Sequence, residues 1–179
     1  MTFLENWRTA MGQSILKRKL QKGGAIARKT IALDKLKSIG LVASGKDAEY
    51  EQWTKMTQKV FGTQAKINWL WYSTEKETKL ESGPAFVLVD KKSYSFFYQA
   101  KPAALDSFNN QKNELILCLD EEPSMVLINF LAQSKAQFRV GYSGMHDYSF
   151  ELMLDMSAKK TKAHFISEAH KYIKLMNPS

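Results

Sequence analysis

The sequence contains a single cysteine and no long apolar run. One thiol cannot form an intrachain disulfide, so a cytoplasmic, reducing compartment is the simplest expectation. Cys118 lies inside the apolar run LILCL, which favours a buried core thiol over an exposed nucleophile. No stretch approaches the roughly 20 apolar residues of a membrane-spanning helix. The first residues, MTFLENWRTAMGQ, also lack the apolar segment and cleavage site of a secretory signal.

Nucleotide-binding and catalytic motifs are missing as well. Neither G-x-G-x-x-G nor G-x-x-x-x-G-K-[ST] occurs, so a nucleotide site is poorly supported. His164 and His170 are six residues apart in a predicted helix, so they fall on different faces and do not form a metal pair. His146 and Asp147 are neighbours in a predicted loop, where a solvated histidine is the simpler interpretation. We therefore expect no catalytic residue, no metal site and no cofactor.

Positive charge is abundant but unevenly distributed. The formal net charge is +8. Residues 1–30 hold seven Lys and Arg against Glu5 alone, which is seven minus one, or +6. A nucleic-acid-binding surface would spread its charge over the folded body and interleave aromatic residues, so nucleic acid is not the expected partner. The basic character belongs to an N-terminal arm, which we place at residues 1–24.

Residues 3–20 of this arm are predicted to form a basic amphipathic helix. Apolar residues recur every three or four positions until Gly23-Gly24 breaks the pattern: Leu4, Trp7, Met11, Ile15, Leu16 and Leu20. Such a helix packs on its own domain, on a second copy in a homodimer, or on another protein partner. It is also typical of a surface helix resting on an anionic membrane. The sequence leaves these alternatives open.

Residues 25–179 are predicted to form a single α/β domain. The apolar pattern predicts strands at 38–44, 66–73, 85–89, 114–120, 137–143 and 148–157, and helices at 47–61, 102–109, 123–134 and 160–176. Alternation within 66–73 predicts one face with Ile67, Trp69 and Trp71, and another with Leu70 and Tyr72. The strand–helix–strand pattern of residues 114–142 favours a three-layer, Rossmann-like fold with a mainly parallel sheet of about five or six strands.

A ligand site in such a sheet lies beyond the carboxyl ends of the strands, near the point where strand order reverses. Lys46, Asp120, Glu121 and Ser143 follow predicted strands and are candidate ligand-binding residues. The acids at 120–122 also precede a proline, and helix capping is the favoured explanation for them. Arg139 is a fifth candidate. It faces away from its apolar neighbours, and on a covered face it would need an acid or an anionic ligand.

Two resemblances extend these expectations. ELILCLD, a helix rich in Leu and Ala, and LAQSKAQFRVGY resemble a stretch in the N-terminal half of heptosyltransferase-like (GT-B) glycosyltransferases. This resemblance implies the Rossmann-like half of a two-domain enzyme whose other half supplies most of the nucleotide-sugar site. The whole chain, with its basic start, SIGLV strand and terminal KYIKLM helix, resembles a family of uncharacterised bacterial proteins known only as a domain of unknown function.

The leading hypothesis is a small cytoplasmic binding or interaction module that is not an enzyme and uses its basic arm for contact. One alternative is a reduced glycosyltransferase-like enzyme or sugar-phosphate binder at the strand ends, since 179 residues leave no room for the second half of a transferase. Another is peripheral membrane association through residues 3–20. The sequence does not decide between them.

Overall fold

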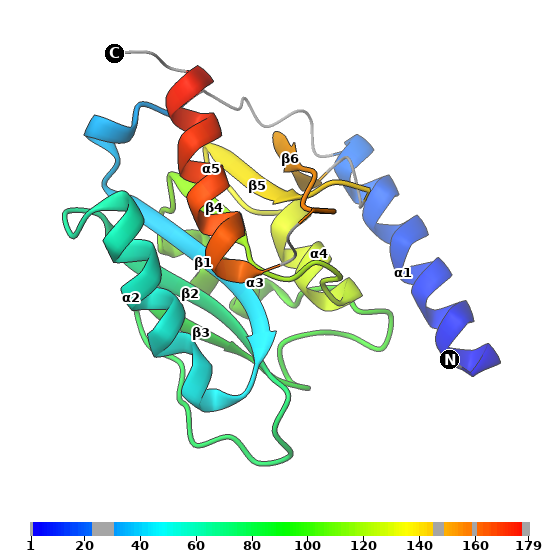
Figure 1. Ribbon diagram of the computed structural model, residues 1–179. Helices are drawn as coiled ribbons and strands as arrows, with labels where there is room; N and C mark the ends of the chain where they lie inside the picture. Colours follow the sequence, from blue (N-terminus) through cyan, green and yellow to red (C-terminus); the bar gives the residue numbers. More distant parts are fainter. Residues whose placement is uncertain (1, 23–30, 145–148, 159–160, 177–179) are drawn as a thin grey trace.

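A six-stranded parallel sheet forms the centre of the computed structural model, which describes residues 2–22, 31–144, 149–158 and 161–176 (Figure 1). The strands are β1 Ser38–Gly45, β2 Lys66–Ser73, β3 Phe86–Val89, β4 Leu115–Cys118, β5 Phe138–Tyr142 and β6 Leu152–Leu154. They lie in the order β3-β2-β1-β4-β5-β6, and all five strand pairings are parallel. The predicted α/β class and parallel sheet are confirmed.

Helices cover both faces of the sheet. They are α1 Phe3–Lys22, α2 Tyr50–Phe61, α3 Pro102–Asn110, α4 Met125–Ala132 and α5 Lys162–Met176, with short 3-10 helices η1 Leu33–Lys35 and η2 Asp47–Glu49. Figure 1 shows α2 and α5 in front of the sheet and α3 and α4 behind it, with α1 beside α4. The three predicted layers are present.

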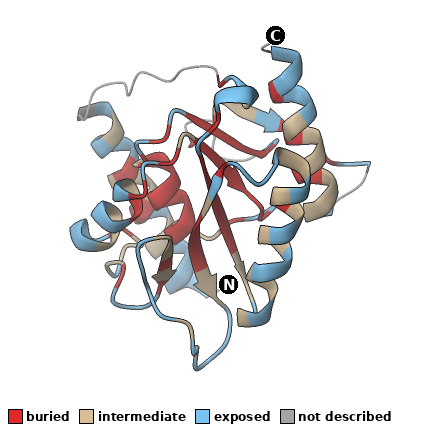
Figure 2. Ribbon diagram, turned by 90° about the vertical axis from the view of Figure 1, so that its left-hand side faces the viewer, coloured by how far each residue is buried: buried red, intermediate tan, exposed pale blue. Residues whose placement is uncertain are grey.

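Strand alternation builds a separate apolar core on each face of the sheet. In β2, Trp69 and Trp71 pack with α5 residues such as Phe165, whereas Leu70 packs on the other side with α4 residues such as Phe130. The predicted two faces of β2 are therefore confirmed. Figure 2 shows the strands largely buried and the outer sides of the helices exposed.

Cys118 belongs to the core on the α4 side, as predicted. Burial raises the pKa of its thiol, because a thiolate loses its hydration in an apolar environment. The side chain therefore contributes packing rather than chemistry.

Some element boundaries differ from the predictions. The predicted strand 148–157 is confined to Leu152–Leu154. Before it, Phe150 packs on Gly141, where any Cβ would come within 2.6 Å of the aromatic ring. Helix α4 begins later than predicted, because the Ser124 hydroxyl is its cap and accepts a hydrogen bond from the Leu127 N–H. The favoured assignment of the acids at 120–122 as the helix cap is therefore wrong.

Candidate functional site

The strand order reverses between β1 and β4, which makes this crevice the position where parallel sheets bind ligands. Three polar residues meet there. Asp120 lies two residues beyond β4, Ser44 is near the end of β1, and Lys162 is the first residue of α5. Of these, Asp120 is one of the predicted site residues.

Asp120 joins β1 to α5. One of its carboxylate oxygens accepts hydrogen bonds from both the backbone N–H and the hydroxyl of Ser44, each at 2.7 Å. The other oxygen lies 3.2 Å from the Lys162 ammonium, which also donates to the Ser44 carbonyl at 3.3 Å. Asp120 is buried, and its charge is balanced by a neighbouring cation. The crevice is therefore bridged by the protein's own ion pair.

Lys162 was not among the residues predicted from the sequence. A lysine in the first turn of a helix faces the positive end of the helix dipole and is electrostatically unfavourable there. That mismatch was the available signal, because it indicates that the ammonium has a compensating partner elsewhere in the fold. Here the partner is Asp120, 42 residues earlier in the chain. The ammonium also lies 5.7 Å from the centre of the Trp53 ring.

Arg139 lies in the first half of β5 and is paired within the protein. Its guanidinium binds both carboxylate oxygens of Glu151, with N–O distances of 3.0 and 2.6 Å. Its remaining terminal nitrogen donates to the Leu131 carbonyl at 2.7 Å. Of the two partners that the sequence allowed, the structure contains the acid. Arg139 does not join Asp120 at the strand ends.

The other predicted residues also lie at the carboxyl edge of the sheet. Lys46 is exposed and precedes η2, Glu121 is exposed after β4, and Ser143 is exposed after β5. The Ser143 backbone N–H donates to the Leu154 carbonyl at 2.9 Å. His146-Asp147, the loop pair considered as an acid and base, lies outside the described residues.

Asp47 connects the end of β2 to the loop that follows it. Its carboxylate accepts hydrogen bonds from the hydroxyls of Ser73 and Thr78, each at 2.7 Å, and from the Lys79 backbone N–H at 3.2 Å. Burial alone would raise the pKa of Asp47, but these hydrogen bonds outweigh it and lower the pKa below its ordinary value. Asp47 therefore holds this loop in place.

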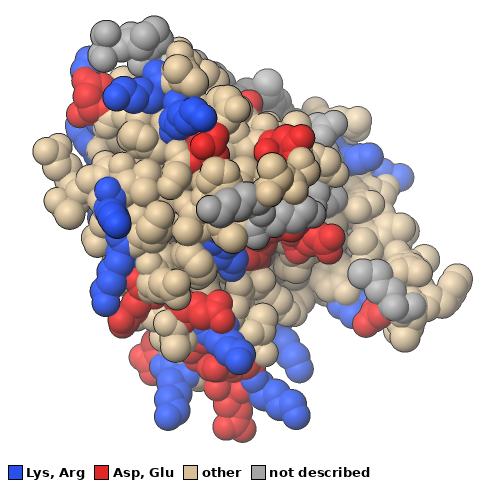
Figure 3. Space-filling model, in the orientation of Figure 1, with Lys and Arg blue, Asp and Glu red and all other residues tan. Residues whose placement is uncertain are grey.

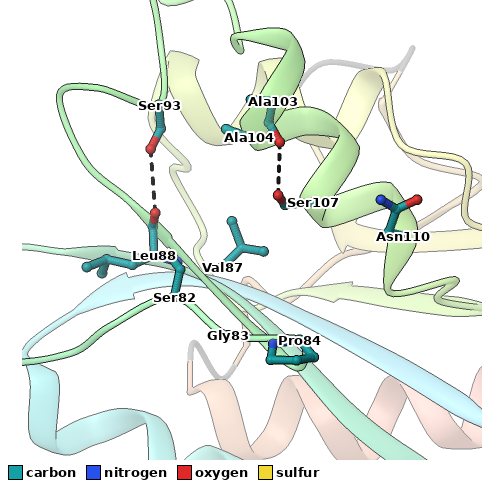
Figure 4. Close-up of a pocket in the computed structure, with 10 residues that line it drawn as sticks. All are labelled: Ser82, Gly83, Pro84, Val87, Leu88, Ser93, Ala103, Ala104, Ser107 and Asn110. Carbon is teal, nitrogen blue, oxygen red and sulfur yellow. Dashed lines mark hydrogen bonds between the residues drawn. The ribbon is translucent and has the colours of Figure 1, made fainter.

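A groove of about 560 Å³ lies between α3 and the segment that includes β3 (Figure 4). Its hydroxyl groups already have protein partners. Ser107 donates to the Ala103 carbonyl, Ser93 binds Asp90, and Ser82 accepts a hydrogen bond from the Leu88 N–H. A second groove, of about 580 Å³, is lined by aromatic residues of α2, β2 and β3. In neither groove do ionisable groups converge in a way that indicates catalysis.

The N-terminal end of α1 carries a set of exposed apolar side chains, here called the α1 tip. Its members and their exposed fractions are Phe3 (89%), Leu4 (56%), Trp7 (46%), Met11 (38%) and the neighbouring Phe96 (53%). The predicted apolar stripe of α1 is therefore divided. Leu16 faces inward and is fully buried, whereas Leu4, Trp7 and Met11 face solvent.

Polar contacts hold α1 on a platform formed by residues 94–100. The Arg8 guanidinium donates to the Phe96 carbonyl at 3.0 Å and lies over the rings of Phe96 and Tyr98. The Gln99 amide donates to the Gly12 carbonyl at 2.9 Å. At Gly12 any Cβ would come within 2.6 Å of the Phe97 carbonyl oxygen, so only glycine allows this close approach.

Asn129 fastens the platform to the rest of the domain. It is a fully buried polar residue in the otherwise apolar α4, and its side-chain oxygen accepts a hydrogen bond from the Ala100 N–H at 2.9 Å. The helix start is fixed separately. The Thr2 hydroxyl accepts from the Glu5 N–H, and the Glu5 carboxylate accepts from the Thr2 N–H, which is a capping box. The α1 tip is thus a helical surface held in a defined place.

Basic residues follow the α1 tip along the same helix. Lys17, Arg18 and Lys19 are all exposed. In Figure 3 blue Lys and Arg surface gathers toward the C-terminal end of α1, at the upper right, while tan surface predominates at its N-terminal end. No helix among the described residues is long and apolar enough to cross a membrane. Within the same part of the chain, no group of three or more His, Cys, Asp or Glu side chains could hold a metal ion.

Comparison with known proteins identifies the family. The model of a family described as "Family of unknown function (DUF6913)" matches residues 8–176, so the chain belongs to this family. The resemblance of the whole chain to a domain of unknown function is confirmed. Searches of the curated proteins and of the solved structures gave no match.

Proposed function

We propose that this member of a family of unknown function is a non-enzymatic interaction module whose contact surface is the α1 tip. The observation that carries the proposal is a concentration of exposed apolar side chains. Among the described residues, nine large apolar side chains are exposed, and five of them form the α1 tip. A localised apolar patch of this kind marks an interaction surface, whereas scattered exposed apolar residues need no explanation.

The exposed side chains of Phe3 and Leu4 contribute little to the position of α1, whereas Trp7 also packs edge-to-face on Phe97, with 5.6 Å between the ring centroids. Leu16, the close approach at Gly12 and the hydrogen bonds of Arg8 and Gln99 attach the helix to the domain. The side chains of Phe3 and Leu4 remain in water, so their apolar surface adds little to the stability of the fold. An anchored helix that presents unburied apolar side chains is well suited to bury them against a partner.

The charged groups of the sheet support a binding role rather than catalysis. Asp120 and Arg139 are the two buried charged candidates, and each is bound by a protein group of opposite charge. Catalytic acids and bases need a substrate within hydrogen-bonding reach. Here Lys162 and Glu151 occupy those positions.

A pair of serine substitutions tests the proposal. The double variant Leu4→Ser/Trp7→Ser should stay folded with only a small decrease of the thermal unfolding midpoint, because Leu4 is 56% exposed and Trp7 loses one edge-to-face contact with Phe97. Leu175→Ser is the matched control, since Leu175 is an exposed leucine on α5. Two probes report contact: sedimentation of the protein with lipid vesicles, and sedimentation velocity of the protein alone. We expect the double variant to lose whichever association the wild type shows, and the control to keep it.

Two outcomes would contradict the proposal. Unfolding that is destabilised by the several kcal/mol typical of buried large-to-small substitutions would mean that the α1 tip is part of the core. Equal association of wild type and double variant would mean that the α1 tip is not the contact surface.

A second candidate function is the binding of a sugar phosphate at the strand ends, as the likeness of residues 114–142 to glycosyltransferases implies. The position of Lys162 favours it, because this lysine lies at the β1–β4 crevice and its side chain is 24% exposed. A phosphate could therefore reach the ammonium. A ligand at 100 times its dissociation constant stabilises a protein by about 2.7 kcal/mol. A thermal-shift screen with sugar phosphates tests this, and Lys162→Met should abolish any shift.

A further inference from the structure

We infer that the partner of the α1 tip is an anionic lipid bilayer. This inference rests on the proposed function, because it names what the α1 tip contacts. Three features support it: the distribution of apolar and basic residues along α1, the charge that a second copy would add, and the attachment of α1 to the domain.

The exposed basic residues of α1 are separated from the α1 tip along the helix axis, since Arg8, the basic residue within the tip, is half-buried against Phe96 and Tyr98. The helix has 20 residues and is therefore about 30 Å long at 1.5 Å per residue. The α1 tip residues from Phe3 to Met11 occupy the first ~12 Å, and Arg18 follows about 10 Å beyond Met11. Helical spacing places Leu4, Trp7, Met11 and Arg18 on one side. A bilayer presents the matching sequence of layers, since apolar chains lie beneath charged headgroups.

The side-chain types fit the interfacial layer of a membrane. Phe and Trp are characteristic of helices that rest at the boundary between headgroups and acyl chains, and Lys and Arg bind the anionic headgroups above them. The α1 tip holds Phe3, Trp7 and Phe96, and the basic group holds Lys17, Arg18 and Lys19. Because the domain occupies the inner side of α1, only the outer side can enter the interface. The helix therefore attaches at the surface and does not span the bilayer.

The charge of α1 favours a bilayer over a second copy of the chain. Glu5 is the only acid in α1, and its carboxylate already accepts the Thr2 N–H. Two copies joined through α1 would bring two basic groups into one interface with little opposing charge. Anionic lipid supplies the missing negative charge in excess. Each Lys or Arg near such a surface strengthens binding by about fivefold.

Vesicle sedimentation tests the inference with the full chain. The probes are phosphatidylcholine vesicles with and without phosphatidylglycerol, at low and high salt. We expect binding to the vesicles that contain phosphatidylglycerol and weaker binding at high salt, because salt screens exposed charges. Leu4→Ser/Trp7→Ser should weaken binding by roughly tenfold or more, given the apolar area withheld from the bilayer. Lys17→Gln/Arg18→Gln/Lys19→Gln should weaken it by about 100-fold.

Matched controls separate the α1 surface from general charge and hydrophobicity. Lys55→Gln/Lys59→Gln/Lys174→Gln removes the same charge from exposed lysines of α2 and α5, which lie on the opposite side of the sheet. Leu175→Ser removes an exposed leucine from α5. Both controls should bind vesicles like the wild type, and all variants should stay folded, with the small decrease of the unfolding midpoint confined to the Trp7 variant.

The outcomes distinguish this inference from the proposed function. Vesicle binding that the α1 variants lose and the controls keep supports both. Absence of vesicle binding, with a self-association that Leu4→Ser/Trp7→Ser abolishes, overturns the lipid partner but leaves the α1 tip as the contact surface. Vesicle binding that falls equally in the controls overturns the inference. If the wild type neither binds vesicles nor self-associates, both are overturned.

Discussion

Removal of Glu151 gives the sharpest test of how this domain uses its buried charge. Arg139 is 5% exposed and depends on Glu151 for two of its hydrogen bonds. In Glu151→Leu the guanidinium would stay in the core with only the Leu131 carbonyl as a partner. The sequence allowed either an acid or an anionic ligand beside Arg139. The variant therefore tests whether Glu151 is the group that balances the buried charge of Arg139.

The expected loss follows from the cost of an unpaired buried charge. Breaking a buried ion pair by removing one partner typically costs about 3–5 kcal/mol. A domain of this size is stable by only about 5–15 kcal/mol, so Glu151→Leu should lose a large part of its stability. The unfolding midpoint should fall by roughly 6–20 °C, at about 2–4 °C per kcal/mol for a chain of this length. Arg139→Met should cost less, because Glu151 is 17% exposed and can recover water.

The double variant Arg139→Met/Glu151→Leu provides the decisive comparison. Replacement of a buried pair by apolar residues of similar volume is often close to neutral, so the double variant should be more stable than Glu151→Leu. Urea unfolding followed by circular dichroism gives the free energies for the cycle. The reasoning is refuted if Glu151→Leu loses less than about 1 kcal/mol, or if the losses of the two single variants simply add.

Three further predictions concern single residues. Gly45→Ala should destabilise the fold by about 1–3 kcal/mol, because its Cβ would lie 2.9 Å from the buried Trp71 ring, whereas Gly83→Ala, with no atom within 4 Å, should be nearly neutral in the same urea assay. The hydrogen bonds to Asp47 lower its pKa, so they stabilise the fold above the unfolded-state pKa of about 4, and this stabilisation is lost as pH falls through the lower folded pKa. Asp47→Asn should therefore make the unfolding midpoint decline less steeply in acid, and an unchanged decline would contradict the role of these hydrogen bonds. Burial raises the pKa of Cys118, so a thiol reagent should modify it only after unfolding, and rapid modification of the native protein would show that the thiol is accessible.

The regular elements were predictable where local pattern and tertiary packing agree. The predicted range of β2 matches the structure because the centre of this strand is buried on both faces, and apolar and aromatic residues from Ile67 to Tyr72 mark most of its length. The predicted length of the last strand was too great, because Phe150 and Glu151 continue its alternating pattern without belonging to it. Phe150 packs on Gly141, and Glu151 binds Arg139. A periodic pattern of apolar residues indicates which side chains are buried, and a buried side chain can also lie outside a strand.

The candidate site was predictable only in part. Asp120 could be placed at the carboxyl edge because it follows a predicted strand, but its partner Lys162 lies far along the chain and carries no motif. Arg139 was recognised as a residue that needs a partner, although the identity of the partner depended on where Glu151 returns to β5. Side chains that combine through long-range contacts leave little trace in local sequence.

The α1 helix shows which properties are determined by the sequence and which are determined by the tertiary structure. Sequence alone determined that residues near the N-terminus form a basic helix with apolar positions, because helical period and charge are local properties. Only the tertiary structure decided that Leu16 is buried while Phe3 and Leu4 remain largely in water. The direction in which the helix faces is set by the carbonyl of Phe96, the amide of Gln99 and the approach at Gly12. These contacts join segments more than 80 residues apart, and no local pattern encodes them.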